Sequence, residues 1–308
     1  MKCAVALTFL ALGLLGLASA AWADSFAFST FDVPGASITE AFGVNDAEQI
    51  VGRYSGADTV THGFLYTNST FTPVNVPGAG DTHAKGINDV AQIVGSFSGF
   101  SMTASFIYDG GNFTIINMPS SLATSATGIN NSGQVVGTLG DGRSFLYTNG
   151  TFTSFYVPNA TGTAAFDIND SGQIVGGFVD ANGHGHGFLD TGGMFTILDI
   201  PGITDLEATG INDTGQIVGW FFDTGGSHSF LYFNGAYTTF DLPGAYHTEA
   251  FGINNAGQIV GRYTTSQNLQ YRGFLATPVP EPASFWMLAF VGVLGVLILG
   301  TASQAGIR

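Results

Sequence analysis

The stretch Gly43-Val44-Asn45-Asp46-Ala47-Glu48-Gln49-Ile50-Val51-Gly52 recurs five more times in this chain, in copies that start at Gly86, Gly128, Asp167, Gly210 and Gly252. The asparagines of the six copies lie 43, 42, 39, 43 and 42 residues apart, and they are Asn45, Asn88, Asn130, Asn169, Asn212 and Asn254. A repeat of this length is typical of a solenoid, an open array or a propeller. The sequence therefore predicts one continuous repeat body over residues 24–277.

The composition favours strands and tight turns over helices. Only 9% of the 308 residues are charged, aromatic residues reach 13%, and the chain contains 45 glycines. All 22 acidic residues lie at or after Asp24, whereas the repeat body contains only five lysines and arginines. Such an acidic body would repel the phosphates of a nucleic acid, so we expect no nucleic acid partner.

Each repeat predicts four short strands. The first is like Phe71–Val76 and ends at a proline, which cannot donate to a sheet ladder. The second, like Thr248–Ile253, turns through Asn and Gly into a third, like Gln258–Tyr263. The fourth, like Gly63–Tyr66, leads into the next first strand through pairs such as Asn149-Gly150, which are type I′ hairpin signals. A blade therefore runs second, third, fourth, first.

The two ends of the repeat body are out of phase with that blade. The last fourth strand, Arg272–Leu275, has no first strand after it, whereas Phe26–Val33 is a first strand with nothing before it. A ring closed by its own N-terminal strand explains both observations, because closure removes exposed sheet edges. We predict an all-β, six-bladed β-propeller of four-stranded blades. The alternatives are a different blade count made by pairing two chains, or an open β-array.

Residues 1–23 have the pattern of a secretory signal peptide. Lys2 is followed by an uncharged apolar run, and the small residues Ala21 and Ala23 flank Trp22 as an A-x-A cleavage site. An uncleaved membrane anchor is the alternative. The single cysteine, Cys3, lies within this segment, so the repeat body has no disulfide.

Residues 278–308 have three parts: the motif Pro280-Glu281-Pro282, an uncharged apolar stretch over 284–300, and a short tail ending in Arg308. This segment resembles the PEP-CTERM sorting signal of Gram-negative bacteria, although the usual arginine cluster after the apolar stretch is reduced to Arg308. The resemblance implies transient anchoring in the inner membrane by a transmembrane helix, recognition by an exosortase, and a final location on the outer cell surface or in the extracellular matrix. An anchor that is never cut is the alternative.

Residues 25–276 resemble the HAF family of extracellular repeats. The family's His-Ala-Phe appears as His62-Gly63-Phe64, His186-Gly187-Phe188 and His228-Ser229-Phe230, and the Gly-Ile-Asn and Gln-Ile-Val-Gly phrases also match. The resemblance implies a secreted repeat protein and supplies no molecular activity.

A candidate ligand site lies five residues before each repeated asparagine. These positions hold three carboxylates and an imidazole, Glu40, His83, Glu207 and Glu249, together with Ser125 and Ala164. If the second strand lines the central channel, they converge on a funnel that could bind a cation or a sugar, or supply an acid and a base. Strand ends at a wet opening are the alternative reading.

We expect no cofactor and no metal site. The Asn-Asp turns offer one carboxylate each, fewer than calcium requires, and hairpin geometry explains them. Nucleophile and phosphate-binding motifs are absent from the sequence. The sequence therefore favours an exported, non-enzymatic surface or matrix protein that binds extracellular polysaccharide or protein. The alternative is a secreted carbohydrate-active enzyme, a glycosidase or lyase, that uses the acidic funnel.

Overall fold

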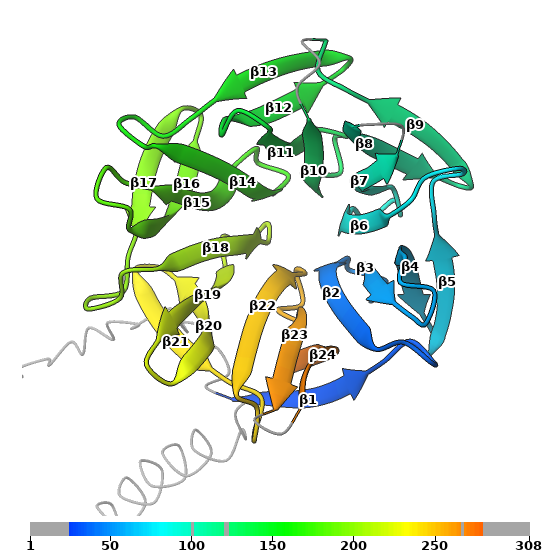
Figure 1. Ribbon diagram of the computed structural model, residues 1–308. Coiled ribbons are helices and arrows are strands. Elements are labelled where there is room, and N and C mark those ends of the chain that lie inside the picture. Colours follow the sequence, from blue (N-terminus) through cyan, green and yellow to red (C-terminus); the bar gives the residue numbers. More distant parts are fainter. Residues whose placement is uncertain (1–24, 100–101, 120–122, 266–267, 280–308) are drawn as a thin grey trace, which may run out of the picture. The chain divides into compact units, whose positions relative to one another are not determined.

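The computed structural model describes residues 25–99, 102–119, 123–265 and 268–279. These residues form 24 β-strands and no helix, within the compact unit Ser25–Pro278. The strands make six four-stranded antiparallel sheets, which surround a central axis (Figure 1). The predicted all-β, six-bladed propeller is confirmed. The predicted signal peptide and the sorting motif from Pro280 onward lie outside the described residues.

Five of the blades run outward from the axis in chain order, and the last differs only in its outermost strand. The innermost strands are β2 (Ile38–Val44), β6 (Thr82–Ile87), β10 (Thr124–Ile129), β14 (Gly162–Ile168), β18 (Leu206–Ile211) and β22 (His247–Ile253). The second strands are β3 (Ile50–Ser55), β7 (Ile93–Gly99), β11 (Val135–Leu139), β15 (Ile174–Val179), β19 (Ile217–Asp223) and β23 (Ile259–Thr265).

The third and outermost strands of the six blades are given in the same blade order. The third strands are β4 (Thr61–Thr67), β8 (Met102–Asp109), β12 (Ser144–Thr148), β16 (Gly185–Thr191), β20 (Gly226–Phe233) and β24 (Asn268–Pro278). The outermost strands are β5 (Thr70–Val74), β9 (Asn112–Ile116), β13 (Thr151–Phe155), β17 (Met194–Leu198), β21 (Ala236–Phe240) and, in the last blade, β1 (Phe26–Phe31). We number the blades 1 to 6 from β2 to β22.

The ring is closed by the N-terminal strand, as the sequence predicts. β1 pairs antiparallel with β24, with Phe28 opposite Ala276 and Phe31 opposite Gly273. The ring of Phe31 also stacks on Tyr66 of blade 1, with 5.1 Å between the ring centroids. Residues more than 240 positions apart are thus neighbours, and blade 6 has the same four strands as the others.

The predicted hairpin turns between third and outermost strands have the required backbone. Asn149 and Gly150 both have positive φ, at 49° and 85°, which is the type I′ conformation. Asn68 and Ser69 adopt it as well, at 47° and 62°.

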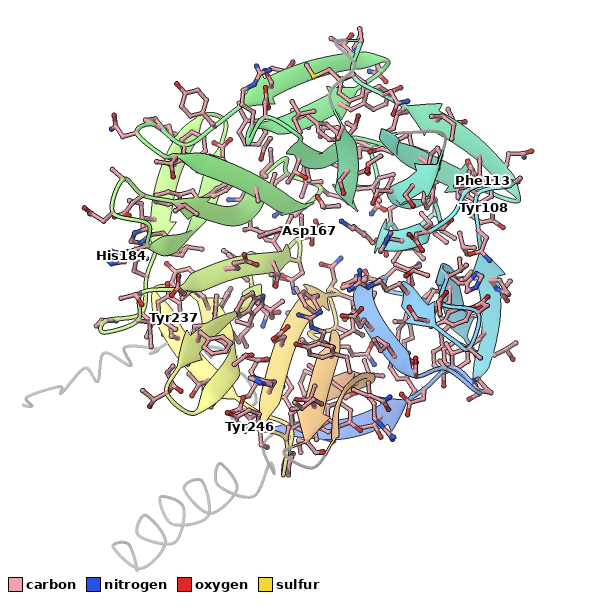
Figure 2. All side chains as sticks on the ribbon, viewed as in Figure 1. Tyr108, Phe113, Asp167, His184, Tyr237 and Tyr246 are labelled. Atoms are coloured by element: carbon pink, nitrogen blue, oxygen red, sulfur yellow. The ribbon has the colours of Figure 1, made fainter. Side chains whose placement is uncertain are left out.

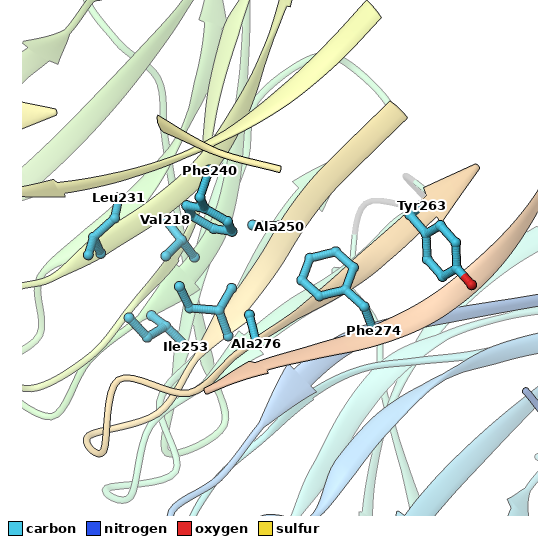
Figure 3. Packing of buried hydrophobic residues seen from close by; sticks show 9 residues of the cluster. Val218, Leu231, Phe240, Ala250, Ile253, Tyr263, Phe274 and Ala276 are labelled. Atoms are coloured by element: carbon cyan, nitrogen blue, oxygen red, sulfur yellow. The ribbon is translucent and has the colours of Figure 1, made fainter. Parts of the chain in front are cut away.

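The hydrophobic core lies between neighbouring blades. In one cluster Val218, Leu231 and Phe240 of blade 5 pack against residues of blade 6, among them Ala250 and Phe274 (Figure 3). Each third strand contributes one phenylalanine with no exposed surface, and these are Phe64, Phe106, Phe145, Phe188, Phe230 and Phe274. The repeated phenylalanine therefore marks the centre of each blade.

The glycine of each Ile-Val-Gly phrase, and Gly137 of the Val-Val-Gly in blade 3, makes room for that phenylalanine. A methyl group added to Gly137 would lie 2.8 Å from the Phe145 ring and closer still to the Ser125 carbonyl oxygen. The backbone oxygen cannot move without breaking the β10–β11 pairing, so no larger residue fits here.

We expect Gly137→Ala to lower the free energy of unfolding by about 3 kcal/mol, the upper end for overpacking, because the clash involves backbone. Gly162→Ala is the matched control, since a methyl group at Gly162 would have no atom within 4 Å. Urea unfolding of both variants measures the difference, and equal stability of the two would contradict this account.

Candidate functional site

One end of the axis is formed by the repeated asparagines. The Asn45 Oδ1 atom accepts from the Gln49 backbone N–H at 2.9 Å and so holds its own turn. The Asn45 Nδ2 atom donates to the Gln49 Oε1 atom at 2.8 Å and to the Asn88 carbonyl oxygen of the next blade at 3.0 Å. The same bonds recur in every blade, and Asn254 donates to the Asn45 carbonyl oxygen at 3.1 Å. The asparagines thus form a closed ring of hydrogen bonds between blades.

The residue after each asparagine forms a second ring. The Asp46 backbone N–H donates to the Asp89 Oδ1 atom at 2.9 Å, and the Asn255 N–H donates to Asp46 at 2.8 Å. Asn131 also donates from Nδ2 to Asp89 and Asp170, at 2.8 Å each. Among the described residues no group of three or more His, Cys, Asp or Glu side chains is arranged to hold a metal ion. These turn residues connect the blades.

Farther along the axis the innermost strands approach one another closely through glycine. A methyl group added to Gly86 would lie 3.0 Å from the Cα atom of Gly128, and Gly252 meets Gly43 in the same way at 3.1 Å. Blade 4 carries Asp167 at this position, and Figure 2 shows Asp167 beside the axis. The Asp167 carboxylate accepts backbone N–H groups of Ile168 and Ile211, while burial raises the pKa of Asp167 to about 7.

Each innermost strand then has a β-bulge at the same place. In blade 1 the register shifts between Ala41 and Gly43, so Phe42 has no partner on β3. A bulge re-aims the side chain of its extra residue. The six bulge residues all line one axial cavity, and they are Phe42, Lys85, Thr127, Phe166, Thr209 and Phe251.

This axial cavity has a volume of about 270 Å³. Its wall is completed by Arg53, Glu207, Trp220 and Arg262. Arg53, Arg262 and Trp220 each follow an Ile-Val-Gly phrase, so the second strands of three blades also supply side chains to the cavity. Ligand pockets in proteins are mostly apolar with a few placed polar groups, and this cavity has that character.

The structure places the four predicted funnel residues around this cavity in different ways. Glu207 lines the cavity directly. Glu40 and Glu249 are 1% and 4% exposed and lie behind the arginines. The His83 Nδ1 atom is 3.2 Å from the Arg53 Nη1 atom. Their assignment as ligand-binding residues remains a prediction.

Two arginines neutralise the buried carboxylates. Glu40 forms ion pairs with both Arg53 and Arg262, and the Arg262 Nε atom donates to Glu249 at 2.6 Å. Burial alone would raise the pKa of Glu40, but the hydrogen bonds and charges of the two arginines outweigh burial and lower this pKa. The Arg53 and Arg262 guanidinium groups also lie over the rings of Phe42 and Phe251, at 5.6 and 5.3 Å. The funnel is therefore an ion-pair network rather than an acidic patch.

Three other groups at the cavity have altered protonation. Burial, with the nearby Glu249 carboxylate, raises the pKa of Glu207 to about 7. Burial and the charges of Arg53 and Lys85 lower the pKa of His83 to about 4, so this imidazole is neutral at pH 7. Burial also lowers the pKa of Lys85 to about 8, which leaves this amine mostly protonated at pH 7.

Trp220 carries a hydrogen-bond donor without a partner. Its side chain lines the cavity opposite Glu207 in the β18–β19 pairing. Its Nε1 atom is buried and has no hydrogen-bond partner within the described part of the chain. Because this atom has almost no exposed surface, Trp220 offers the cavity its indole ring rather than its N–H group.

Comparisons with known proteins show the fold alone. No protein family and no curated protein matches this sequence. Among solved structures, the chain is similar to the β-propeller domain of the Trilobed protease from Pyrococcus furiosus, with 12% identity over 80% of this chain and 82% of that one, and a TM-score of 0.52. That domain has an open velcro topology, whereas this propeller is closed by the β1–β24 pair.

Two further structures are similar to the same extent. AofleA from Arthrobotrys oligospora is 12% identical, with 83% of this chain and 91% of that chain covered and a TM-score of 0.53. A putative gluconolactonase is 12% identical, with 82% of this chain and 92% of that chain covered and a TM-score of 0.50.

The part of the chain that the structure describes contains no helix of the length and hydrophobicity needed to span a bilayer.

We expect Glu40→Gln to lower the free energy of unfolding by about 3 kcal/mol at pH 7, because it leaves two guanidinium groups without their shared carboxylate. The loss lies at the low end of the usual range, since both arginines are partly exposed. A lowered carboxyl pKa stabilises the fold above the pKa of the unfolded chain, and this stabilisation is lost as the pH falls through the folded pKa. The difference between the variant and the original chain should therefore shrink below pH ~4.

Urea unfolding at pH 7 and at acidic pH tests this expectation. Asp141→Asn is the control, because the Asp141–Arg143 pair is exposed and should contribute little to stability. A Glu40→Gln loss no larger than that of the control would show that the network does not stabilise the propeller.

Proposed function

We propose that this protein is an exported, non-enzymatic component of the outer surface or extracellular matrix of a Gram-negative bacterium, and that it binds extracellular polysaccharide in the axial cavity. The signal-peptide pattern of residues 1–23 and the Pro280-Glu281-Pro282 segment support export and sorting. An exosortase and, before processing, the inner membrane are the partners that this sorting segment requires.

The observation that carries the binding proposal is the lining of the axial cavity. Phe42, Phe166, Phe251 and Trp220 offer aromatic surfaces, on which the apolar face of a sugar ring can pack. The polar groups of Lys85, Glu207 and Thr209 in the same lining can hydrogen-bond to sugar hydroxyls. A cavity that combines these groups suits a small part of a saccharide chain, such as an end or a single unit.

One observation supports a second candidate function, a secreted glycosidase or lyase. Glu207 lines the cavity and has a pKa of about 7, which suits a general acid at neutral pH. The other two carboxylates, Glu40 and Glu249, are bonded to arginines, so an ionised partner for Glu207 has to come from an already paired group. Release of reducing ends from the host's exopolysaccharide, lost in Glu207→Gln, would favour the enzyme.

We expect the purified chain to be retarded in gels that contain the host's exopolysaccharide, and Trp220→Ala to weaken this binding about tenfold or more through loss of a buried aromatic contact. Phe222→Ala is the matched control, because Phe222 is 47% exposed and does not line the cavity. Equal retardation of the two variants would show that the polysaccharide does not bind in the axial cavity.

We expect mass spectrometry of the protein from its host to show an N-terminus at Asp24 and loss of the apolar stretch 284–300. Replacing Pro280, Glu281 and Pro282 by alanine should leave that stretch attached. The resemblance to the sorting signal implies that the exosortase recognises this motif. Recovery of the original protein with Arg308 at its C-terminus would argue for an anchor that is not cut.

A further inference from the structure

The axial cavity collects most of the positive charge of an acidic protein. Residues 25–279 contain five lysines and arginines, and three of them, Arg53, Lys85 and Arg262, line this cavity. The other two, Arg143 and Arg272, form ion pairs with Asp141 and Asp32 at the outer strands. The positive charge of the repeat body is therefore concentrated at the cavity.

The carboxylates around the cavity do not fully neutralise these three cations. Arg53 and Arg262 share Glu40 and Glu249, which are two anions for two cations, and the third carboxyl, Glu207, is only partly ionised at neutral pH because burial raises its pKa to about 7. The Lys85 Nζ atom donates to the Ser125 Oγ atom at 3.0 Å and makes no ion pair with any residue in the described ranges. A half-buried ammonium without a counter-charge is costly, and an anionic ligand would remove that cost.

We propose that the ligand of the axial cavity is an acidic sugar, one that carries a carboxylate or sulfate group, with Lys85 as the residue that binds the anion. This inference rests on the proposed function, since it names the class of polysaccharide for the same cavity. Lys85 is a bulge residue, so its side chain is turned out of the sheet and into the cavity.

The arrangement of the other side chains supports this assignment. Arg53 and Arg262 lie in blades 1 and 6, next to Lys85 in blade 2, so the positive groups occupy one arc of the wall. The Phe42 and Phe251 rings lie below the same arc, in an edge-to-face pair with 5.2 Å between centroids. A sugar ring in contact with these phenylalanines would lie in the same cavity as Lys85, where an acidic substituent can reach the ammonium group. Blades 3 and 4 contribute only Thr127 and Phe166 to the lining, and neither side chain is charged.

The test is calorimetric titration of the full-length chain, in detergent, with three oligosaccharides of equal length: an oligouronate, a sulfated oligosaccharide and a neutral oligoglucose. We expect at least one acidic oligosaccharide to bind at least tenfold more tightly than the neutral one, with the preference falling as NaCl is raised. Lys85→Gln should remove about a factor of ten, or about 1.4 kcal/mol, and Lys85→Arg should restore most of it. Arg143→Gln, which removes an equal charge at the outer strands, should change nothing.

The possible outcomes separate the two proposals. Preference for the uronate or for the sulfated oligosaccharide identifies the acidic group, and either supports the inference. Equal binding of neutral and acidic oligosaccharides, unchanged in Lys85→Gln, would overturn the inference while leaving polysaccharide binding intact. Absence of binding by all three would overturn both. The melting temperature of Lys85→Gln, compared with that of Arg143→Gln, shows whether a loss of binding comes from unfolding.

Discussion

The propeller depends on hydrogen bonds that pass from each blade to the next at the axis. Each repeated asparagine holds its own turn through Oδ1 and reaches the carbonyl oxygen of the following blade through Nδ2. The last of these bonds, from Asn254 to Asn45, exists only because the chain returns to its start. All six asparagines are buried at 3–4% exposure, where an unpaired amide would be expensive, so the ring of bonds and the closed geometry require each other. The β1–β24 pairing secures the same closure at the outer edge.

The architecture was predictable because each of the six repeats contains the same strand and turn signals. Asn-Gly turns fixed the hairpins, and the phase difference between Phe26–Val33 and Arg272–Leu275 fixed the closing strand. The site was predictable only in part. The sequence led to Glu40, Glu207 and Glu249, whereas the cavity is lined in every blade by the bulge residue, such as Phe42 two positions after Glu40. Strand alternation places both residues on the same face, but a bulge has no strong sequence signature, so the pattern could not show which of the two meets the axis.

A signal for the cavity residues was nevertheless present within the repeats. Each innermost strand contains Ala-x-Gly, with Asp167 in place of the glycine in blade 4, and only the middle residue varies widely in character. The alanines are fully buried and the glycines meet the neighbouring strand, so both are fixed by packing. The charge arrangement, in contrast, follows from pairs across strands and blades. Arg53 meets Glu40 across the β2–β3 hairpin, but Arg262 reaches Glu40 only in the closed ring, so two of the three carboxylates that look acidic in the sequence are paired with arginines.

The bulge has a consequence for how such proteins diversify. Because the extra residue of each bulge has no partner on the adjacent strand, its side chain can change without altering the alanine and glycine that hold the sheet. The six blades therefore give natural selection six separate positions around a single opening, each changeable by one codon. A lineage of duplicated genes could keep this framework and acquire different recognition properties, and the present combination of three phenylalanines, two threonines and one lysine is one member of that range.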